Sequence, residues 1–454
     1  MLTPRRIYVR IGCLPLNLVF QSNFYAMCSG LHHTLPDFPN FPYFKSQQER
    51  PDPMELPIYL DHAATTPMLP AVMEAMLPYF LESYGNPSAL HSVGMAAREG
   101  VEQARKTIAD TLNATPEEIV FTSGGTESDN TAIFGIANFA EANKERKRHL
   151  LTTPIEHHAV LDPFETLAQR GYEVEYLPVD HEGLVDPFDV ERMLRPDTLL
   201  VSVMHANNEI GTLQPIGEIG AVCRAQSVRF HTDAVQTYGR IPIDVRAMKI
   251  DLLSLTGHKF YGPKGCGVLY VRRGTQLRRF MEGGGQERGR RGGTLNVPGI
   301  VGLGKAAEIA HTGMQAEIAR LTQLRERFMS QLTRAVGGVH ITGSRTERLP
   351  NNIHLLIEGV QGEPLLLALD AAGICASAGS ACSAGSTEPS PVLKAIGIDR
   401  DLARGALRLT LGRSTDSEGL DYTLKTLVRT IEELRALSGT SQALGSDPDR
   451  TAVA

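Results

Sequence analysis

DLLSLTGHKFYGPKGCGVLYV, residues 251–271, is the stretch from which the rest of the chain is interpreted. It contains two apolar runs with the length and composition of buried strands. The turn between them carries Thr256, Gly257, His258 and Lys259, and a bend rich in glycine and proline follows. A lysine beside two buried strands is unusual, because lysine is rarely buried unless it is paired. The role of Lys259 therefore has to be decided from the rest of the sequence.

Three interpretations of Lys259 are open at this point. The first is a surface lysine in a hairpin turn, which is the commonest situation for a single lysine. The second is a phosphate-binding P-loop, because Gly257 and Gly262 have its glycine spacing, but Pro263 stands where that motif needs lysine. The third is a lysine that forms a Schiff base with a carbonyl cofactor.

The composition is typical of a soluble enzyme with two or three domains. The chain has 454 residues, of which 42% are hydrophobic and 21% charged, and its net charge is −6. This charge argues against a polyanion-binding face as the main activity. The cysteines form no CxxC pair, so a disulfide framework or structural zinc site is not expected, and a reducing compartment is favoured. They are Cys13, Cys28, Cys223, Cys266, Cys375 and Cys382. No apolar run approaches the ~18 residues of a membrane span.

The two ends differ in composition from the rest. Residues 1–53 are rich in Pro, Phe and Asn, and Arg5, Arg6 and Arg10 suggest a targeting peptide that Pro15 would interrupt. Met54 directly precedes the first well-patterned strand. We predict that residues 1–53 are an extra segment that is disordered or absent from the native protein. Residues 438–454 are rich in Gly, Ser, Asp and Ala, which predicts a disordered tail.

The central part of the chain alternates strand and helix patterns, which predicts a largely parallel sheet covered by helices. Sites in such sheets lie at the carboxyl ends of the strands. Five predicted strands end in polar or glycine-rich groups, so we expect these groups to form one pocket. They are SGGT at 123–126, EHH at 156–158, NNE at 207–209, Asp233 with Gln236, and the turn of Lys259.

The residue types in this pocket restrict its chemistry. Small hydroxyl residues and two glycines at the start of a helix, as at 123–126, favour an anion such as phosphate. Asp233 suits the nitrogen of a pyridine ring, which it would keep protonated. His157 suits stacking on a ring and proton transfer near neutral pH. If the strand continues through this pair, His158 points away from the site.

The remainder of the chain predicts a second, smaller α+β domain. Residues 281–296 form a Gly/Arg loop, which lacks the interleaved aromatic residues of an RNA-binding patch and fits an approach to a ligand or a second subunit. A capping box of Thr415 and Glu418 predicts the start of the last helix. Cys375 fits a small core residue, whereas Cys382 lies in a Gly/Ser loop and is a candidate nucleophile.

Taken together, these motifs resemble the cysteine desulfurases of the NifS/IscS type, a class-V aminotransferase family of pyridoxal-phosphate (PLP) enzymes with fold type I. The resemblance covers roughly residues 58–437. The motifs that carry it are YLDHAATT, YGNPS, FTSGGTESDN, EHHAV, HANNEIG, HTDAVQ, TGHKFYGPKG, GGGQERGRRGGT and SAGSACSAGSTEPS.

The resemblance implies a fold and a division into domains. The fold is α/β, with a large domain built on a mostly parallel seven-stranded sheet and a smaller α+β domain. Residues 54–70 would be an arm of the small domain, 71–310 the large cofactor-binding domain, and 311–437 the small domain that carries the cysteine loop.

The resemblance also implies catalytic roles. Lys259 would form the Schiff base, Asp233 would pair with the pyridine nitrogen, and His157 would stack on the ring as acid/base. Cys382 would take the sulfur atom. Arg408 would bind the substrate carboxylate, for which a bidentate fork is suited, with help from Asn351.

The remaining cofactor contacts follow from the same resemblance. The phosphate would be held by Gly125, Thr126, Thr256 and His258, and by Thr294 from the other subunit of a homodimer. Asn208 and Gln236 would bind the ring and its substituents. The family usually has serine at the position of Thr256, a change that keeps the hydroxyl group.

The function implied is conversion of L-cysteine to L-alanine with formation of a persulfide on Cys382. The sulfur would pass to an iron–sulfur scaffold or a tRNA-thiolation enzyme in the cytoplasm, without membrane or direct nucleic-acid binding. The alternatives are a selenocysteine lyase or another fold type I enzyme, and a non-catalytic scaffold. Transamination needs no nucleophile in the loop, and a scaffold has no need of all five residues: Lys259, Asp233, His157, Arg408 and Cys382.

Overall fold

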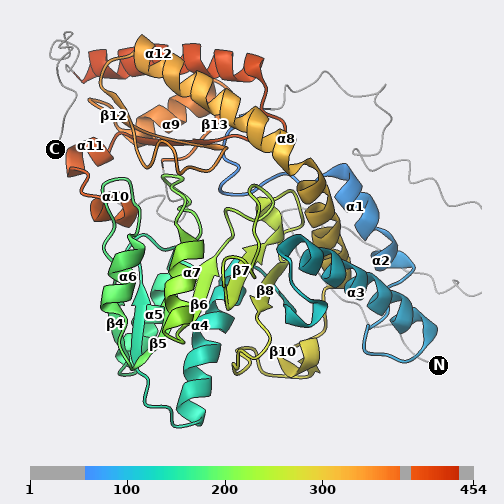
Figure 1. The fold of residues 1–454 in the computed structure, drawn as a ribbon. Coiled ribbons are helices and arrows are strands. Elements are labelled where there is room, and N and C mark those ends of the chain that lie inside the picture. Colours follow the sequence, from blue (N-terminus) through green and yellow to red (C-terminus); the bar gives the residue numbers. More distant parts are fainter. Residues whose placement is uncertain (1–56, 379–389, 439–454) are drawn as a thin grey trace, which may run out of the picture. The chain divides into compact units, whose positions relative to one another are not determined.

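Seven strands form one sheet in the computed structural model of the chain, which describes residues 57–378 and 390–438 (Figure 1). The sheet confirms the predicted fold class. Strand β8 is antiparallel to both β2 and β7, and the other neighbours are parallel. In spatial order the strands are β2 (Ile119–Thr122), β8 (Gly267–Val271), β7 (Leu252–Thr256), β6 (Arg229–Asp233), β5 (Thr198–Ser202), β3 (His149–Thr152) and β4 (Glu173–Tyr176).

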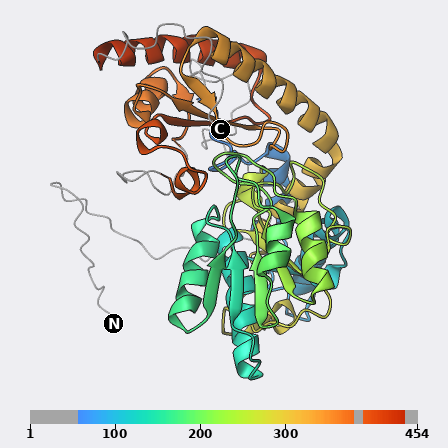
Figure 2. The ribbon, with the colours of Figure 1, turned by 60° about the vertical axis from the view of Figure 1, so that its left-hand side comes forward.

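Helices cover both faces of this sheet (Figures 1 and 2). Alternate residues of a strand point to opposite faces, so neighbours such as Leu252 and Leu253 enter different cores. Leu252 packs with helices α4 and α5, whereas Leu253 packs with α3, α6, α7 and the first part of α8. This burial on both faces explains why the strands are almost entirely apolar.

Twelve α-helices occur in the described residues. They are α1 (Pro70–Met76), α2 (Pro78–Leu81), α3 (Ser92–Leu112), α4 (Gly125–Ala142), α5 (His158–Gln169), α6 (Pro187–Met193), α7 (Ile216–Ala225), α8 (Val297–Ala335), α9 (Gly362–Ala371), α10 (Pro391–Ala395), α11 (Arg400–Ala403) and α12 (Ser417–Leu437).

A second, antiparallel sheet consists of β11 (Val339–Ile341), β12 (Asn352–Ile357) and β14 (Ala406–Thr410). Its core is shared with α9, α12 and the later part of α8. The short strand β1 (Ile58–Tyr59) pairs with β13 (Ile374–Cys375). Helix α8 contributes to both cores and runs through residue 310 without interruption. The domain limits at 70, 310 and 437 remain predictions.

Two local predictions are wrong. Strand β3 ends at Thr152, so the two histidines of EHH lie not on a strand but at the start of α5. Pro154 follows two residues later, and proline cannot extend a central strand because it lacks a backbone N–H. The last helix is capped not by Thr415 but by Asp416, whose side chain accepts from the backbone N–H of Gly419 at 2.8 Å.

Several predictions lie outside the described residues: the segment 1–53, the tail from residue 439 onward, and the loop with Cys382. In the part of the chain that is described, none of the helices combines the length and apolar character needed to cross a membrane. The same residues contain no group of three or more His, Cys, Asp or Glu side chains arranged to hold a metal ion.

Candidate active site

Lys259 ends the short 3-10 helix η2 (Gly257–Lys259), which directly follows the carboxyl end of β7. Its Nζ atom donates to the backbone carbonyl oxygens of Ala63 and Ala64, the latter at 2.8 Å. The pKa of Lys259 is lowered to about 8, mainly because burial penalises the charged ammonium, and then because Arg240 and Arg408 repel it. A larger fraction of this amine is therefore neutral near physiological pH than for an ordinary lysine.

The segment that accepts from Lys259 is the arm 61–66, within the motif YLDHAATT. Its backbone is fixed to the lysine turn by Thr66, whose N–H donates to the carbonyl oxygen of His258 at 2.8 Å. The Oγ1 atom of Thr65 is 3.1 Å from Nδ1 of His258. The arm thus brings the beginning of the described chain to the centre of the site.

Asp233 ends β6, beside β7, and is 6% exposed. Its Oδ1 atom accepts from the N–H of Val235 at 2.8 Å. Burial raises the pKa of Asp233 to about 7, and the charge of Asp129 adds to this shift. A cationic ring N–H placed against Asp233 would reverse the shift and keep the carboxylate ionised.

A buried polar network lies behind Asp233. His231, two residues earlier on the same face of β6, has Nδ1 at 2.8 Å from the Oγ of Ser202 and Nε2 at 3.1 Å from the Oγ of Ser254. The same Nε2 is 3.5 Å from Oδ1 of Asp129, which lies on α4. Burial raises the pKa of Asp129 to about 7 and lowers that of His231 to about 4. Both groups are therefore biased toward their neutral forms.

His157 is the N-cap of α5, and its Nδ1 atom accepts from the N–H of Ala159 at 3.1 Å. Because Nδ1 is an acceptor, a proton on the neutral ring must sit on Nε2. Burial lowers the pKa of His157, while the charge of Asp233 raises it and that of Lys259 lowers it further. His157, Asp233 and Lys259 therefore lie within electrostatic reach of one another. His158 points elsewhere, toward Asp162, and is exposed.

The turn at 123–126 opens helix α4, with Gly124 as its N-cap. Gly124 has φ 157°, a conformation that favours glycine, and a Cβ atom on Gly125 would lie 2.7 Å from Cγ2 of Val235. The first N–H groups of a helix have no intrahelical acceptor, so this turn can bind an anion. Thr256 is adjacent, since a Cβ on Gly124 would lie 3.7 Å from its Oγ1.

Two of the predicted phosphate ligands already have partners. The hydroxyl of Thr256 donates to the carbonyl oxygen of Cys266 at 3.1 Å, so it would have to rotate to donate to a phosphate. His258 is engaged with Thr65, and burial lowers its pKa to about 4. Thr126 is exposed at the start of α4 and available to a ligand.

The two predicted ring ligands border the same space. The side-chain amide of Gln236 donates to the carbonyl oxygen of Ala63 at 3.1 Å. The carbonyl oxygen of Asn208 accepts from Nη1 of Arg408 at 3.0 Å. Asn208 therefore joins the end of the large sheet to the predicted substrate arginine.

Arg408 lies on β14, and its side chain is 2% exposed. Its Nη2 atom is 2.8 Å from Oδ1 of Asp61, and its Nε has no hydrogen-bond partner among the described residues. Asn351, directly before β12, donates to the carbonyl oxygen of Leu411 at 3.2 Å. Its buried Oδ1 likewise has no partner in the described ranges.

Thr294 is not brought into this group by any described contact. It is exposed between β10 (Arg291–Gly292) and α8. The loop before it is anchored to the glycine turn, because Arg291 binds the carboxylate of Glu127 on α4 at 2.6 and 3.1 Å. Cys382 lies outside the described residues, so its position relative to Lys259 stays a prediction.

Sequence reasoning missed four contributors to the site. Arg240 donates to the carbonyl oxygens of Lys259 at 2.7 Å and His62 at 3.1 Å, and so joins the lysine turn to the arm. Asp61 pairs with Arg408, and Asp129 lies behind Asp233. The carbonyl groups of the arm could not be found, because backbone acceptors leave no signal in the residue types. Asp61 lies in the motif YLDHAATT, and this was the signal that could have identified it.

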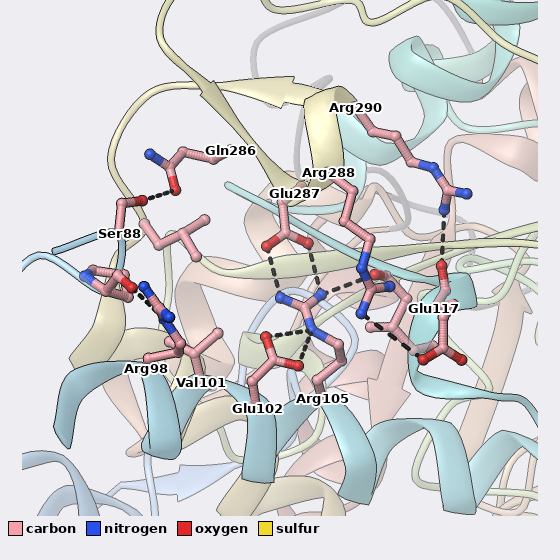
Figure 3. Close-up of a pocket in the computed structure, with 13 residues that line it drawn as sticks. Ser88, Arg98, Val101, Glu102, Arg105, Glu117, Gln286, Glu287, Arg288 and Arg290 are labelled. Carbon is pink, nitrogen blue, oxygen red and sulfur yellow. Dashed lines mark hydrogen bonds and ion pairs between the residues drawn. The ribbon is translucent and has the colours of Figure 1, made fainter. Parts of the chain in front are cut away.

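A separate cavity of about 290 Å3 lies between α3 and the Gly/Arg loop (Figure 3). Arg105 lies there between Glu102 and Glu287, and Arg290 extends toward Glu117. Arg105 binds both carboxylate oxygens of Glu287, at 2.7 and 2.8 Å. None of the predicted site residues lines this cavity. Its paired charges are those of a structural ion-pair network.

Comparison with known proteins identifies the family. Residues 58–423 match the sequence profile described as aminotransferase class-V. The chain is 50% identical over 385 residues to the cysteine desulfurase IscS of Dictyoglomus turgidum, which covers 85% of this chain and 97% of that protein. It is 46% identical over 389 residues to the human cysteine desulfurase, covering 85% of this chain and 84% of that protein.

Comparison with solved structures leads to the same family. A NifS-like protein superposes with a TM-score of 0.78 at 38% identity, covering 83% of this chain and all of that one. A structure described as SspA in complex with cysteine superposes with a TM-score of 0.69 at 40% identity, covering 78% and 98% of the two chains. The chain therefore belongs to the PLP-dependent class-V aminotransferase family and, within it, to the cysteine desulfurases.

Proposed function

We propose that this chain converts L-cysteine to L-alanine and transfers the sulfur atom to its own Cys382 as a persulfide. The observation that carries the proposal is that Asp233 and Lys259, at the carboxyl ends of the adjoining strands β6 and β7, lie within electrostatic reach of His157 at the start of α5, with Arg408 reaching the same space. The proposal agrees with the relatives that carry the name cysteine desulfurase.

The site fits PLP as its cofactor. Asp233 is a buried carboxylate with one oxygen bound to Val235, which suits a charged ring N–H on the other. The turn at Gly124 and Gly125 is open to an anion, and a Cβ on Gly125 would collide with Val235. We assign the phosphate to Gly125, Thr126, Thr256 and His258, and the ring and its substituents to His157, Asn208, Asp233 and Gln236.

When bound, PLP supplies an aldehyde that links to amino groups and a protonated ring that stores the electron pair left when the α-proton is removed. Lys259 would supply the amine for this link and would accept the α-proton. With a pKa of about 8, about one tenth of the lysine is neutral at pH 7, against about one part in 3,000 for an ordinary lysine. The neutral imidazole of His157 carries its proton on Nε2, and it can donate this proton to a group beside the cofactor ring.

Arg408 and Asn351 would hold the substrate. Among the described residues, Nε of Arg408 and Oδ1 of Asn351 are buried polar atoms without a hydrogen-bond partner. The α-carboxylate of L-cysteine fits the guanidinium, which also fixes the orientation of the thiol.

Sulfur transfer needs one further group, the thiolate of Cys382. This thiolate attacks the substrate sulfur, so that an S–S bond forms while the C–S bond breaks. The carbon keeps the electron pair of the broken bond and takes up a proton, which gives L-alanine. The sulfur remains on Cys382 as a persulfide, so no external oxidant or reductant is consumed.

We propose that the working form is a homodimer. Large apolar side chains are exposed between residues 73 and 95, with Leu81 at 72% and Leu90 at 86% exposure. A patch of this kind marks an interaction surface. A second copy that covers it would also give Thr294 a route to the neighbouring phosphate site. Sedimentation of Leu77→Asp/Leu81→Asp should give monomers where the wild type gives dimers.

We further propose that the persulfide sulfur passes to an acceptor protein, either an iron–sulfur scaffold or a tRNA-thiolation enzyme, in the cytoplasm. The relatives named cysteine desulfurase support the release of sulfur from L-cysteine that either acceptor would use. Incubation with each purified acceptor after loading with radiolabelled cysteine would show which one takes the label.

The proposed function is tested by a single turnover without reductant. The protein loaded with PLP is mixed with L-cysteine, alanine is quantified, and Cys382 peptides are weighed by mass spectrometry. We expect one alanine per subunit and the added mass of one sulfur atom on Cys382. Cys382→Ser should give neither. Full alanine production by Cys382→Ser would overturn the role of Cys382, and no alanine from the wild type would overturn the function.

A further inference from the structure

The guanidinium of Arg408 is held by an acidic side chain from the other end of the described chain. The Oδ1 atom of Asp61 lies 2.8 Å from Nη2 of Arg408, 347 residues later. The side chains are 19% and 2% exposed, so this is a largely buried ion pair. The second contact is from Nη1 to the carbonyl oxygen of Asn208, at 3.0 Å.

These two contacts leave one side of the guanidinium unused. Asp61 occupies Nη2 and Asn208 occupies Nη1, whereas Nε has no partner in the described ranges. Nη2 carries two N–H groups, and one of them shares an edge of the planar fork with the N–H of Nε. A carboxylate can bind this edge through two parallel hydrogen bonds while Asp61 accepts from the other N–H of Nη2. The two contacts therefore select the edge that remains for a ligand.

The position of Asp61 is fixed by contacts that do not involve the side chain of Arg408. The Oη atom of Tyr59 donates to the carbonyl oxygen of Asp61 at 3.1 Å. Asp61 forms a bridge with Thr410, which lies two residues from Arg408 and on the same face of β14. The hydroxyl of Thr410 accepts from the N–H of Ala63 at 2.9 Å. The carboxylate of Asp61 is thus placed opposite Arg408 by the backbone.

The arm does not need the ion pair for its attachment. The N–H of Thr410 donates to the carbonyl oxygen of Leu60 at 2.7 Å. The N–H of Leu60 donates to the carbonyl oxygen of Cys375 at 2.9 Å. These backbone bonds of Leu60, the residue directly before the arm, already attach this segment to β14 and β13. A charged residue at position 61 therefore calls for a role beyond tethering.

Charge supports the same role. A buried arginine without a counter-ion is unfavourable, and Asp61 supplies the opposite charge. Asp61 also offsets at Lys259 the repulsion that comes from Arg408.

We propose that Asp61 is a positioning residue for substrate binding, which holds Arg408 with its Nε edge presented to the α-carboxylate of the amino acid. Asp61 acts through Arg408 and does not touch the substrate. The inference rests on the proposed function, because it assumes that Arg408 binds an amino-acid carboxylate.

The test compares two ligands that differ only at the carboxylate. L-alanine and isopropylamine, which has a methyl group in its place, are titrated into the PLP-loaded protein, and binding is followed by the absorbance of the cofactor. We expect Asp61→Ala to weaken L-alanine binding about tenfold and to leave isopropylamine binding unchanged. Asp61→Asn keeps an acceptor oxygen, so its L-alanine affinity should stay within about threefold of the wild type.

A second background separates positioning from general damage. In Arg408→Met the carboxylate of L-alanine has lost the guanidinium that binds it, so adding Asp61→Ala should not change L-alanine binding further. With L-cysteine, Asp61→Ala should raise KM and leave kcat within about twofold. The proposal is overturned if Asp61→Ala binds L-alanine as tightly as the wild type, or if its affinities for L-alanine and isopropylamine fall equally. It is also overturned if the effects of Asp61→Ala and Arg408→Met on L-alanine binding are additive.

The outcomes keep this inference apart from the proposed function. A wild type that binds L-alanine but makes none from L-cysteine would refute the desulfurase activity, while the Asp61 comparison would still be decided by binding. A wild type that makes alanine from L-cysteine but shows no binding of L-alanine would refute the role of Asp61 and leave the desulfurase activity standing.

Discussion

The Nζ atom of Lys259 lies 2.8 Å from the backbone carbonyl oxygen of Ala64, a residue 195 positions earlier in the chain. This contact joins the arm 61–66 to the turn after β7. The same arm carries Asp61, which holds Arg408. The candidate active site is therefore built where one short N-terminal segment meets the carboxyl ends of the large sheet and the edge of the small one.

Replacement of Lys259 by methionine should abolish activity without unfolding the protein. Methionine keeps much of the side-chain volume and removes a partly buried charge, so the fold should tolerate the change. We expect alanine formation from L-cysteine to fall by at least about 100-fold. After borohydride reduction, mass spectrometry should find the cofactor on Lys259 only in the wild type. Lys264→Met, at an exposed position five residues later, is the matched control and should behave as wild type.

Two substitutions of His157 should separate its chemistry from its helix cap. Asparagine is a good N-cap, so His157→Asn can still accept from the N–H of Ala159. We expect kcat to fall about 100-fold or more in His157→Asn, with the unfolding free energy within about 0.5 kcal/mol of the wild type. His157→Ala should lose about 1 kcal/mol in addition. Equal kcat for His157→Asn and the wild type would show that the ring is not needed.

The buried Asp129 should make the stability of the cofactor-free protein fall as the pH rises. Its pKa is raised from 3.8 to about 7 by burial, so between these values the folded protein keeps a proton that the unfolded chain has lost. The wild type therefore loses stability as the pH rises through this window.

Asp129→Asn cannot titrate, so its stability relative to the wild type should increase with pH. Between about pH 4 and about pH 8 the gain should be at least about 1 kcal/mol and at most roughly 4 kcal/mol, at about 1.4 kcal/mol for each unit of pKa difference. Urea unfolding of both proteins at the two pH values measures it. The same difference at both pH values would contradict the assignment.

The ion pair of Arg105 and Glu287 should contribute far more to stability than a surface pair. The side chains are 5% and 1% exposed, and Glu287 also accepts from the N–H of Phe121 at 2.8 Å. Glu287→Gln leaves Arg105 buried with a weaker partner and should cost about 3 kcal/mol. Asp110→Asn breaks the exposed pair with Lys106 and should cost less than about 0.5 kcal/mol. Equal costs in denaturant unfolding would refute the distinction.

The sequence predicted those parts of the molecule that local patterns specify. Two apolar runs around 251–271 predict β7 and β8, and the glycines at 124 and 125 predict a strand, a turn and a helix. Because sites in such sheets gather at strand ends, the grouping of Lys259, Asp233 and His157 followed. The hydrogen-bond partners of these three residues could not be predicted.

The parts that could not be predicted depend on contacts between distant segments. Asp61 and Arg408 are 347 residues apart, and nothing local marks them as a pair. Lys259 binds backbone carbonyl oxygens, which any residue supplies. The EHH motif is predicted to end a strand, whereas the ring of His157 caps helix α5. In each case a tertiary or capping contact outweighed the local pattern.

The central claim is tested most directly by product analysis. Purified protein is loaded with PLP and incubated with L-cysteine and a reducing thiol, and alanine and sulfide are both quantified. We expect equal amounts of the two products from the wild type and from Lys264→Met, and neither product from Lys259→Met. Bound PLP without alanine or sulfide, or alanine formation that survives in Lys259→Met, would contradict it.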